Sequence, residues 1–263
     1  MGTDSSDPPR APGFTRIVTV TPSDTQASAS ARPSAIGRLL DEISWEGNAR
    51  KYRGGGLGRE NVLTVEVFSA LDFLPRAHFL GRILLAARGA EVARGHLIRD
   101  IDAANIDLLP GDLRPTLPSG QPAEWTVQPD ATISTTNSLC LVEAKRLKPS
   151  SFQPQQLARL AAAIADLNGS QSAFCLLVLR KDPPVNVKGY GYLTLAEALM
   201  LGDRNVGKPD TRLIDKQFAV ITWDEIQRIV ADQVQRFANV DASVESSIGR
   251  LAREVIQSVA RHQ

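Results

Sequence analysis

Residues 139–145 read Leu-Cys-Leu-Val-Glu-Ala-Lys, an apolar run typical of a strand that ends in two charges. A carboxylate or an ammonium group in an apolar strand costs free energy unless it meets a partner, a metal or a phosphate. Because side chains alternate across a strand, Glu143 and Lys145 point to one face and Ala144 to the other. The stretch therefore predicts a buried strand that presents two opposite charges at one place.

A second carboxylate, Asp130, lies upstream in residues 125–134, Trp-Thr-Val-Gln-Pro-Asp-Ala-Thr-Ile-Ser. This segment is rich in β-branched residues, and residues 135–138 (Thr-Thr-Asn-Ser) supply a turn before the next strand. We therefore expect a hairpin that brings Asp130 beside Glu143, with Lys145 on the same spot. The alternative is that Glu143 and Lys145 form the solvated end of a buried strand.

Pro129-Asp130 followed by Glu143-Ala144-Lys145 resembles the PD-(D/E)XK nuclease superfamily, which includes many restriction endonucleases, repair nucleases and Holliday-junction resolvases. The resemblance implies a nuclease that hydrolyses phosphodiester bonds with Mg²⁺, for which Mn²⁺ can substitute. It also implies that Asp130, Glu143 and the backbone carbonyl of Ala144 hold the metal. Lys145 would orient the attacking water and stabilise the phosphoryl oxygens.

A helix is predicted over residues 60–74, since its apolar residues have helical spacing and Pro75 ends it: Leu63, Val67, Ala70, Leu71 and Leu74. Glu60 falls on the apolar side of this helix, whereas Glu66 falls on its flank. The resemblance implies that a glutamate of the first core helix reaches the metal, and Glu60 matches that role better. Alternatively, Glu60 only favours the positive end of the helix dipole.

A second helix is expected between Pro154, in its first turn, and Gly169, after its end. Gln156 lies at the edge of its apolar stripe. The resemblance implies a polar residue near the metal at this place, which makes Gln156 a candidate catalytic residue, although glutamine is also common in a first helical turn.

Two further strands are expected at residues 173–179 and 217–222, with a capping box at Thr194 and Glu197 between them and a helix opening at Thr222. The order helix, strand, strand, helix, strand predicts an α/β fold, a three-layer sandwich with a central mixed sheet flanked by helices. The resemblance implies that this sandwich is restriction-endonuclease-like.

The 263 residues divide into a predicted disordered tail (1–34), a nuclease-like domain (35–240) and a C-terminal helix (241–263). The apolar spacing of that helix favours packing on its own domain, and the alternative is a homodimer contact. No signal peptide or long apolar run is present, so a cytoplasmic protein without a membrane partner is expected. Cys140 and Cys175 lie in apolar strands and are expected to be core residues.

The net charge is +1, so nucleic-acid binding would rely on local basic patches. The glycine-rich segment 50–59 carries Arg50, Lys51, Arg53 and Arg59, which we expect to contact phosphates, unless the segment is only a linker. Tyr190 and Tyr192 offer aromatic rings for bases, though exposed loop tyrosines seldom serve that purpose.

The sequence thus predicts a Mg²⁺-dependent deoxyribonuclease in a restriction, repair or anti-phage context, with RNA as the other substrate. One alternative is a non-catalytic nucleic-acid-binding subunit of a larger assembly that keeps the nuclease fold, and the other is an α/β interaction protein. Replacing Asp130 or Glu143 is expected to leave the stability of the metal-free protein unchanged or slightly higher, because clustered carboxylates repel.

Overall fold

The computed structural model describes residues 59–117, 119–145, 150–202, 206, 209–237 and 242–262, without the side chains of residues 59, 60 and 242–246. The predicted tail (1–34) lies outside this part of the chain. The helices are α3 (Arg59–Phe73), α4 (Leu80–Ala86), α5 (Glu91–Arg99), α6 (Gln156–Leu167), α7 (Leu195–Leu199), α8 (Ile214–Gln217), α9 (Trp223–Phe237) and α10 (Ala242–His262), with 3-10 turns η1 (Ile101–Ala103) and η2 (Thr211–Leu213). No described helix has both the length and the apolar character to cross a membrane.

The main sheet has five strands in the order β1 (Asn105–Leu108), β2 (Ala131–Ser134), β3 (Ser138–Ala144), β4 (Ser172–Leu179) and β7 (Phe218–Thr222). Strands β1, β2 and β3 pair antiparallel, whereas β3, β4 and β7 pair parallel, so the sheet is mixed. The predicted hairpin before Glu143 is confirmed, because β2 and β3 pair with Ala131 opposite Val142. A second, two-stranded sheet joins β5 (Val185–Val187) and β6 (Gly191–Leu193).

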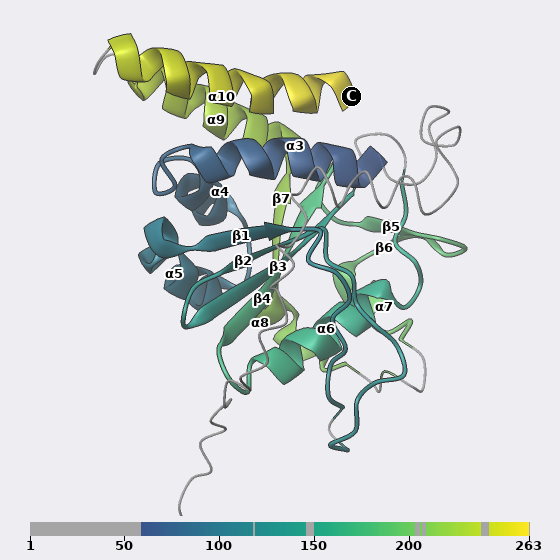
Figure 1. The fold of residues 1–263 in the computed structure, drawn as a ribbon. Helices are drawn as coiled ribbons and strands as arrows, with labels where there is room; N and C mark the ends of the chain where they lie inside the picture. The colour runs from purple at the N-terminus through teal and green to yellow at the C-terminus, as the bar shows by residue number, and fades with distance from the viewer. Residues whose placement is uncertain are drawn as a thin grey trace, which may run out of the picture. The chain divides into compact units, whose positions relative to one another are not determined.

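Helices cover both faces of the main sheet, as Figure 1 shows. Along β3, Cys140, Val142 and Ala144 belong to a core cluster with residues of α3, α4, α5, α9 and α10. Leu141 faces the other way, into a cluster with residues of α6, α7 and β5. This division follows from the alternation of side chains along a strand, and it confirms the predicted α/β class with a central mixed sheet.

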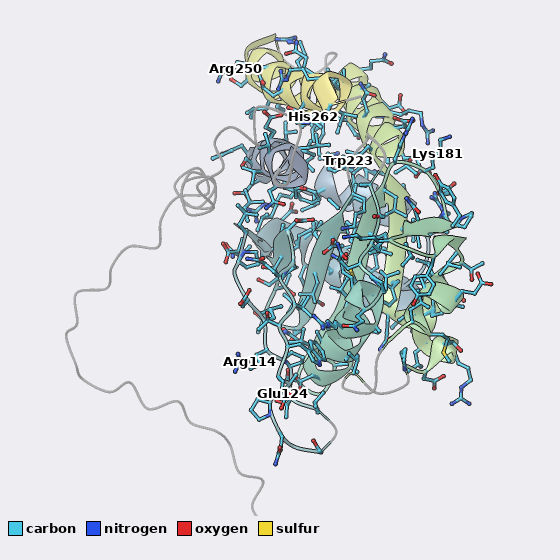
Figure 2. All side chains as sticks on the ribbon, turned by 90° about the vertical axis from the view of Figure 1, so that its right-hand side faces the viewer. Arg114, Glu124, Lys181, Trp223, Arg250 and His262 are labelled. Carbon is cyan, nitrogen blue, oxygen red and sulfur yellow. The ribbon has the colours of Figure 1, made fainter. Side chains whose placement is uncertain are left out.

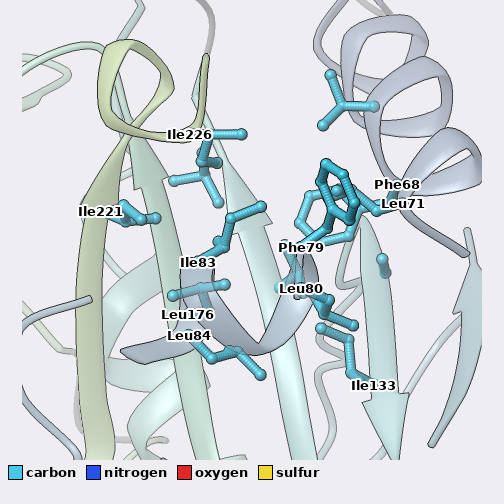
Figure 3. Close-up of a cluster of buried hydrophobic side chains, with 14 of the residues drawn as sticks. Phe68, Leu71, Phe79, Leu80, Ile83, Leu84, Ile133, Leu176, Ile221 and Ile226 are labelled. Atoms are coloured by element: carbon cyan, nitrogen blue, oxygen red, sulfur yellow. The ribbon is translucent and has the colours of Figure 1, made fainter. Parts of the chain in front are cut away.

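The larger cluster is built mainly from large aliphatic and aromatic side chains. Figure 3 shows Phe68 and Leu71 of α3 and Ile83 of α4 on the same side of the sheet as Leu176 of β4. All five apolar residues that predicted α3 are buried. The buried face of α3 thus confirms the helical spacing read from the sequence.

Helix α10 packs against α3 and α9 of the same chain. Its residues Ile248, Val255 and Val259 belong to the larger core cluster. Glu66 of α3 pairs with the end of this helix, 3.4 Å from Arg261 and 3.6 Å from His262. Glu66 therefore serves the contact between α3 and α10.

Candidate active site

The candidate site lies at the end of the main sheet where its parallel strands finish, which we call the carboxyl edge. Strands β3, β4 and β7 are parallel and end there, and β2 begins there because it runs the opposite way. In open α/β sheets, ligands bind beyond the carboxyl ends of the parallel strands. The residues at this edge are Asp130 before β2, Lys145 after β3, Arg180 after β4 and Trp223 after β7.

The hairpin places Asp130 beside the end of β3. Asp130 directly precedes β2, and its backbone N–H donates to Val142 O at 2.9 Å, next to Glu143 on β3. Asp130 Oδ2 accepts a hydrogen bond of 2.7 Å from the backbone N–H of Ala144. Burial raises the pKa of the nearby Cys175 thiol well above its usual range, and the charges of Glu143 and Asp130 add to that effect. Both carboxylates therefore lie close enough to Cys175 for their charges to act on its thiol.

Glu143 is buried, with 4% of its surface exposed, and two side chains hold its carboxylate. Its Oε1 accepts hydrogen bonds from Lys145 Nζ at 2.8 Å and from Gln156 Nε2 at 2.7 Å. Lys145 is 9% exposed, so the alternative in which these charges form a solvated strand end is wrong. The structure therefore brings Glu143, Lys145 and Gln156 together, as the sequence predicts.

Gln156 is the first residue of α6, so the helix begins later in the chain than the sequence predicts. Pro154 lies before the helix, because Gln155 is the N-cap and a turn closes between Gln153 O and Gln156 N at 3.0 Å. The prediction that Pro154 occupies the first helical turn is thus wrong. The turn over residues 153–156 places Gln156, the first residue of α6, within hydrogen-bonding distance of Glu143.

Two aromatic residues that sequence reasoning missed position Lys145. Its ammonium group lies 4.7 Å from the centre of the Phe152 ring, a distance at which a cation is attracted to the ring face. Its backbone carbonyl accepts a hydrogen bond of 2.8 Å from Trp223 Nε1, and Trp223 is fully buried. A tryptophan at the start of a helix that follows a buried strand was the available signal, since a buried indole N–H needs an acceptor.

The backbone of Ala144 also faces Asp130. In a strand, the N–H and C=O groups of one residue point to the same side, so the carbonyl of Ala144 points to the side on which its N–H meets Asp130. The carbonyl of Ala144 therefore lies on the side of β3 that faces Asp130, and its role as a metal ligand stays a prediction.

Other predicted site residues lie outside the described part of the chain. Arg50, Lys51 and Arg53 are not described, and Arg59 and Glu60 are described only as the backbone of the first turn of α3. Helix α3 packs on the face of the sheet opposite to the one that carries Glu143. The roles proposed for these five residues stay predictions.

The described residues contain no group of three or more His, Cys, Asp or Glu side chains placed to hold a metal ion. Asp130 and Glu143 supply two carboxylates. Mg²⁺ is commonly held by one or two carboxylates, with waters and substrate phosphates completing its octahedron. The residues present therefore fit Mg²⁺ better than a metal that needs a full protein cage.

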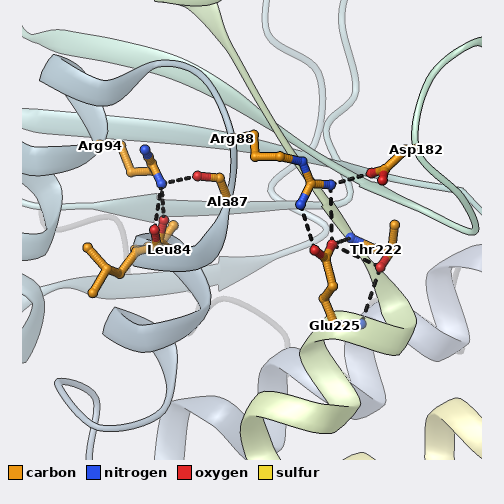
Figure 4. Close-up of polar contacts among 8 residues, drawn as sticks. Leu84, Ala87, Arg88, Arg94, Asp182, Thr222 and Glu225 are labelled. Carbon is orange, nitrogen blue, oxygen red and sulfur yellow. Dashed lines mark hydrogen bonds and ion pairs between the residues drawn. The ribbon is translucent and has the colours of Figure 1, made fainter.

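A network of hydrogen bonds and ion pairs around Arg88 holds together the elements at the β7 side of the carboxyl edge (Figure 4). Arg88 pairs with the outer edge of β7 through two backbone hydrogen bonds to Val220, of 2.9 and 2.8 Å. Its guanidinium group donates to Glu225 at 2.6 Å and to Asp182. Glu225 also accepts from the backbone and hydroxyl groups of Thr222, which caps α9. Arg88 thus joins the loop after β4 to the start of α9.

This network predicts a pH-dependent stability. Burial alone would raise the pKa of Glu225, but the hydrogen bonds from Arg88 and Thr222 outweigh burial and hold the pKa below its usual value. A carboxyl group whose folded pKa is lowered stabilises the fold above its unfolded pKa, and this contribution is lost as pH falls through the folded pKa. Arg88→Gln should therefore lower the urea midpoint most near neutral pH, with a difference that shrinks below about pH 4.

The measurement is urea unfolding of both proteins across this pH range. Arg228→Gln is the matched control, because Arg228 is an exposed arginine of α9 outside the network. A difference between Arg88→Gln and wild type that stays constant with pH would contradict the assigned role of Glu225.

Figure 2 shows Lys181, after β4, and Trp223, after β7, toward the same end of the sheet. Comparisons of this chain with models of known families, with curated proteins and with solved structures found no match.

Proposed function

We propose that this chain is a metal-dependent nuclease that hydrolyses phosphodiester bonds, most naturally those of DNA, on a restriction-endonuclease-like fold of the PD-(D/E)XK type. The observation that supports the proposal is the buried contact of Lys145 and Gln156 with Glu143, next to Asp130, which is bonded to the N–H of Ala144. Burial of an ion pair costs desolvation free energy, which only close geometry and further hydrogen bonds offset. A buried pair is therefore favoured where its charges serve a function or are very well compensated. Its place at the carboxyl edge of the parallel strands favours a use.

Asp130, Glu143 and the carbonyl of Ala144 are the groups that would hold Mg²⁺. When bound, the ion would polarise the phosphate and lower the pKa of a water molecule. The N–H of Ala144 fixes the orientation of the Asp130 carboxylate, and Gln156 fixes that of Glu143. These contacts limit the rearrangement required when the substrate binds.

Lys145 has a separate task. Its ammonium group is held between Glu143 and the Phe152 ring and lines the pocket at the end of β4. A cation at this place can stabilise negative charge that develops on the phosphoryl oxygens, and it can orient the attacking water. Because an ammonium group has no lone pair, Lys145 cannot be a metal ligand.

The direct test is a cleavage assay with the full chain. Plasmid DNA, linear duplex, single-stranded DNA and RNA are each incubated with Mg²⁺, with Mn²⁺ and with EDTA. We expect metal-dependent cleavage of at least one DNA substrate. Asp130→Asn protein, purified in the same way, is the control for a contaminating nuclease. Absence of cleavage on every substrate by correctly folded protein, or equal cleavage by the variant, would contradict the proposal.

A further inference from the structure

A pocket of about 130 Å³ opens beside Lys145 at the carboxyl end of β4. Phe152 and Leu179 are buried parts of its wall, whereas Arg180, Lys181 and Tyr192 are exposed at its mouth. The pocket thus combines an apolar wall, an aromatic ring and two cations, directly next to the proposed catalytic ammonium group. Ligand pockets typically have this composition, apolar walls with a few convergent polar groups.

The cations at the mouth are available to an anion. Neither Arg180 nor Lys181 has an ion-pair partner among the residues that the structure describes. The next residue, Asp182, pairs instead with Arg88, which also pairs with Glu225. The Arg88 network therefore neutralises the acid of this loop and leaves its two cations at the pocket.

The hairpin of β5 and β6 holds Tyr192 at the other side of the mouth. Asn186 and Tyr192 are opposite each other in the register, so their side chains share a face, and both line the pocket. The hairpin turns at Gly189, whose φ of +83° is a conformation that glycine adopts readily, with Tyr190 N bonded to Val187 O at 3.0 Å. Tyr192 is 75% exposed, so its ring is offered to a ligand.

Phe152 ties this hairpin to the catalytic ammonium group. Its backbone N–H donates to Asn186 O at 2.9 Å, and its carbonyl accepts from Lys188 N at 2.9 Å. Its ring is the one that contacts Lys145. The position of Tyr192 relative to Lys145 is therefore set by a continuous chain of contacts.

We propose that this pocket binds an unpaired nucleotide next to the phosphate at Lys145, with Tyr192 stacked on the base and Arg180 and Lys181 on the flanking phosphates. A base inside a duplex is stacked on both faces and would not offer a face to Tyr192, whereas an unpaired base would. Stacking on an aromatic ring tolerates every base, so binding would depend little on sequence. The inference rests on the proposed nuclease function and adds that its substrate is a single strand or an unpaired end.

Binding is tested without cleavage, by fluorescence anisotropy of the full chain in EDTA. The probes are single strands of about 20 nucleotides, oligothymidylate and oligouridylate, and a blunt DNA duplex. Tyr192→Ala should weaken single-strand binding about tenfold and duplex binding much less. Tyr192→Phe should keep wild-type affinity, because the ring is retained. The oligothymidylate and oligouridylate arms tell whether the nucleotide comes from DNA or RNA.

Tyr190→Ala is the matched control, since Tyr190 is an exposed tyrosine of the same hairpin that does not line the pocket. Equal losses for Tyr190→Ala and Tyr192→Ala, or no loss for either, would overturn the proposal. Duplex binding that depends on Tyr192 as strongly as single-strand binding would also overturn it.

The cations are tested through salt. The double variant Arg180→Gln, Lys181→Gln should make the dependence of log affinity on log salt shallower by about 1.4 units on single strands, about 0.7 per phosphate contact. The double variant Arg250→Gln, Arg253→Gln removes the same charge from exposed positions of α10 and should leave the slope unchanged. A slope that both double variants change equally would show that only net charge matters, and would overturn the assignment of Arg180 and Lys181.

The two proposals fail in different ways. Cleavage that requires Asp130, with single-strand binding that is insensitive to Tyr192, would remove the nucleotide pocket and leave the nuclease. Binding that requires Tyr192, without cleavage of any substrate by wild type, would remove the nuclease and leave a nucleotide-binding pocket.

Discussion

Asp130→Asn is expected to reduce Mg²⁺-dependent cleavage by about a thousandfold or more, because loss of a metal ligand removes several kcal/mol of transition-state stabilisation and about 1.4 kcal/mol corresponds to tenfold in rate. Glu143→Gln should lose as much. Both substitutions keep the shape of the side chain and remove its charge. Single-turnover cleavage at saturating Mg²⁺ measures the effect, and a variant that retains near-wild-type cleavage would show that its carboxylate is not an essential ligand.

The two variants should differ in stability, and here the structure corrects the sequence-based expectation. That expectation, stability unchanged or slightly higher, assumed that carboxylate repulsion dominates at Glu143. In the structure the ammonium group of Lys145 pairs with Glu143 at 2.8 Å, and both side chains are buried. Removing one partner of a buried pair leaves the other charge uncompensated, at a cost of up to about 3–5 kcal/mol. Glu143→Gln should therefore be destabilised, while Asp130→Asn keeps the shape of a side chain that is only partly buried and weakens its charge-assisted hydrogen bond from the N–H of Ala144.

A double variant separates these effects. Glu143→Gln with Lys145→Met removes both charges, so urea unfolding should show more stability than Glu143→Gln alone, while cleavage stays absent. Lower stability of the double variant than of Glu143→Gln would contradict an energetic role for the buried pair. Since Asp130→Asn is expected to fold normally, it remains the variant on which the catalytic argument depends.

The sequence predicted those parts of the site that local periodicity determines. Alternation along β3 correctly placed Glu143 and Lys145 together, and the predicted hairpin correctly brought Asp130 beside the end of β3. Gln156 was predicted because its position at the edge of the apolar stripe and the family resemblance indicated the same residue. Phe152 and Trp223 could not be found in this way, because their contacts with Lys145 depend on how β5, β7 and the loops assemble. Residue spacing carries no record of such long-range contacts.

The loop after β4 shows the same limit. As sequence, Arg180, Lys181 and Asp182 form a short mixed-charge stretch with no evident purpose. Their different tasks appear only when Arg88, which lies far upstream in the chain, pairs with Asp182. Arg180 and Lys181, the cations at the mouth of the pocket, thus come from a loop that sequence reasoning did not single out, while the role of the basic segment 50–59 stays a prediction.

Lys145→Met should lower the cleavage rate by about 10²- to 10³-fold, the loss typical for one group that stabilises developing charge in a buried site. Metal affinity should respond in the opposite direction. In the metal-free protein Glu143 is bound to the Lys145 ammonium group, so loss of that cation frees the carboxylate of a competing positive charge. Calorimetry of Mn²⁺ binding should therefore show affinity that is unchanged or tighter, alongside the large loss of rate.

A lower cleavage rate together with unchanged or tighter Mn²⁺ binding distinguishes a catalytic ammonium group from a structural one. If Lys145 only positioned Glu143 for the metal, its removal would weaken Mn²⁺ binding and slow cleavage together. Lys145→Arg is the informative companion, because it retains the charge, but the larger planar guanidinium group does not match the space between Glu143 and Phe152. We expect Lys145→Arg to recover part of the rate that Lys145→Met loses. A joint loss of rate and metal affinity in Lys145→Met would assign Lys145 to the support of Glu143 and leave the developing charge on the phosphate to another cation.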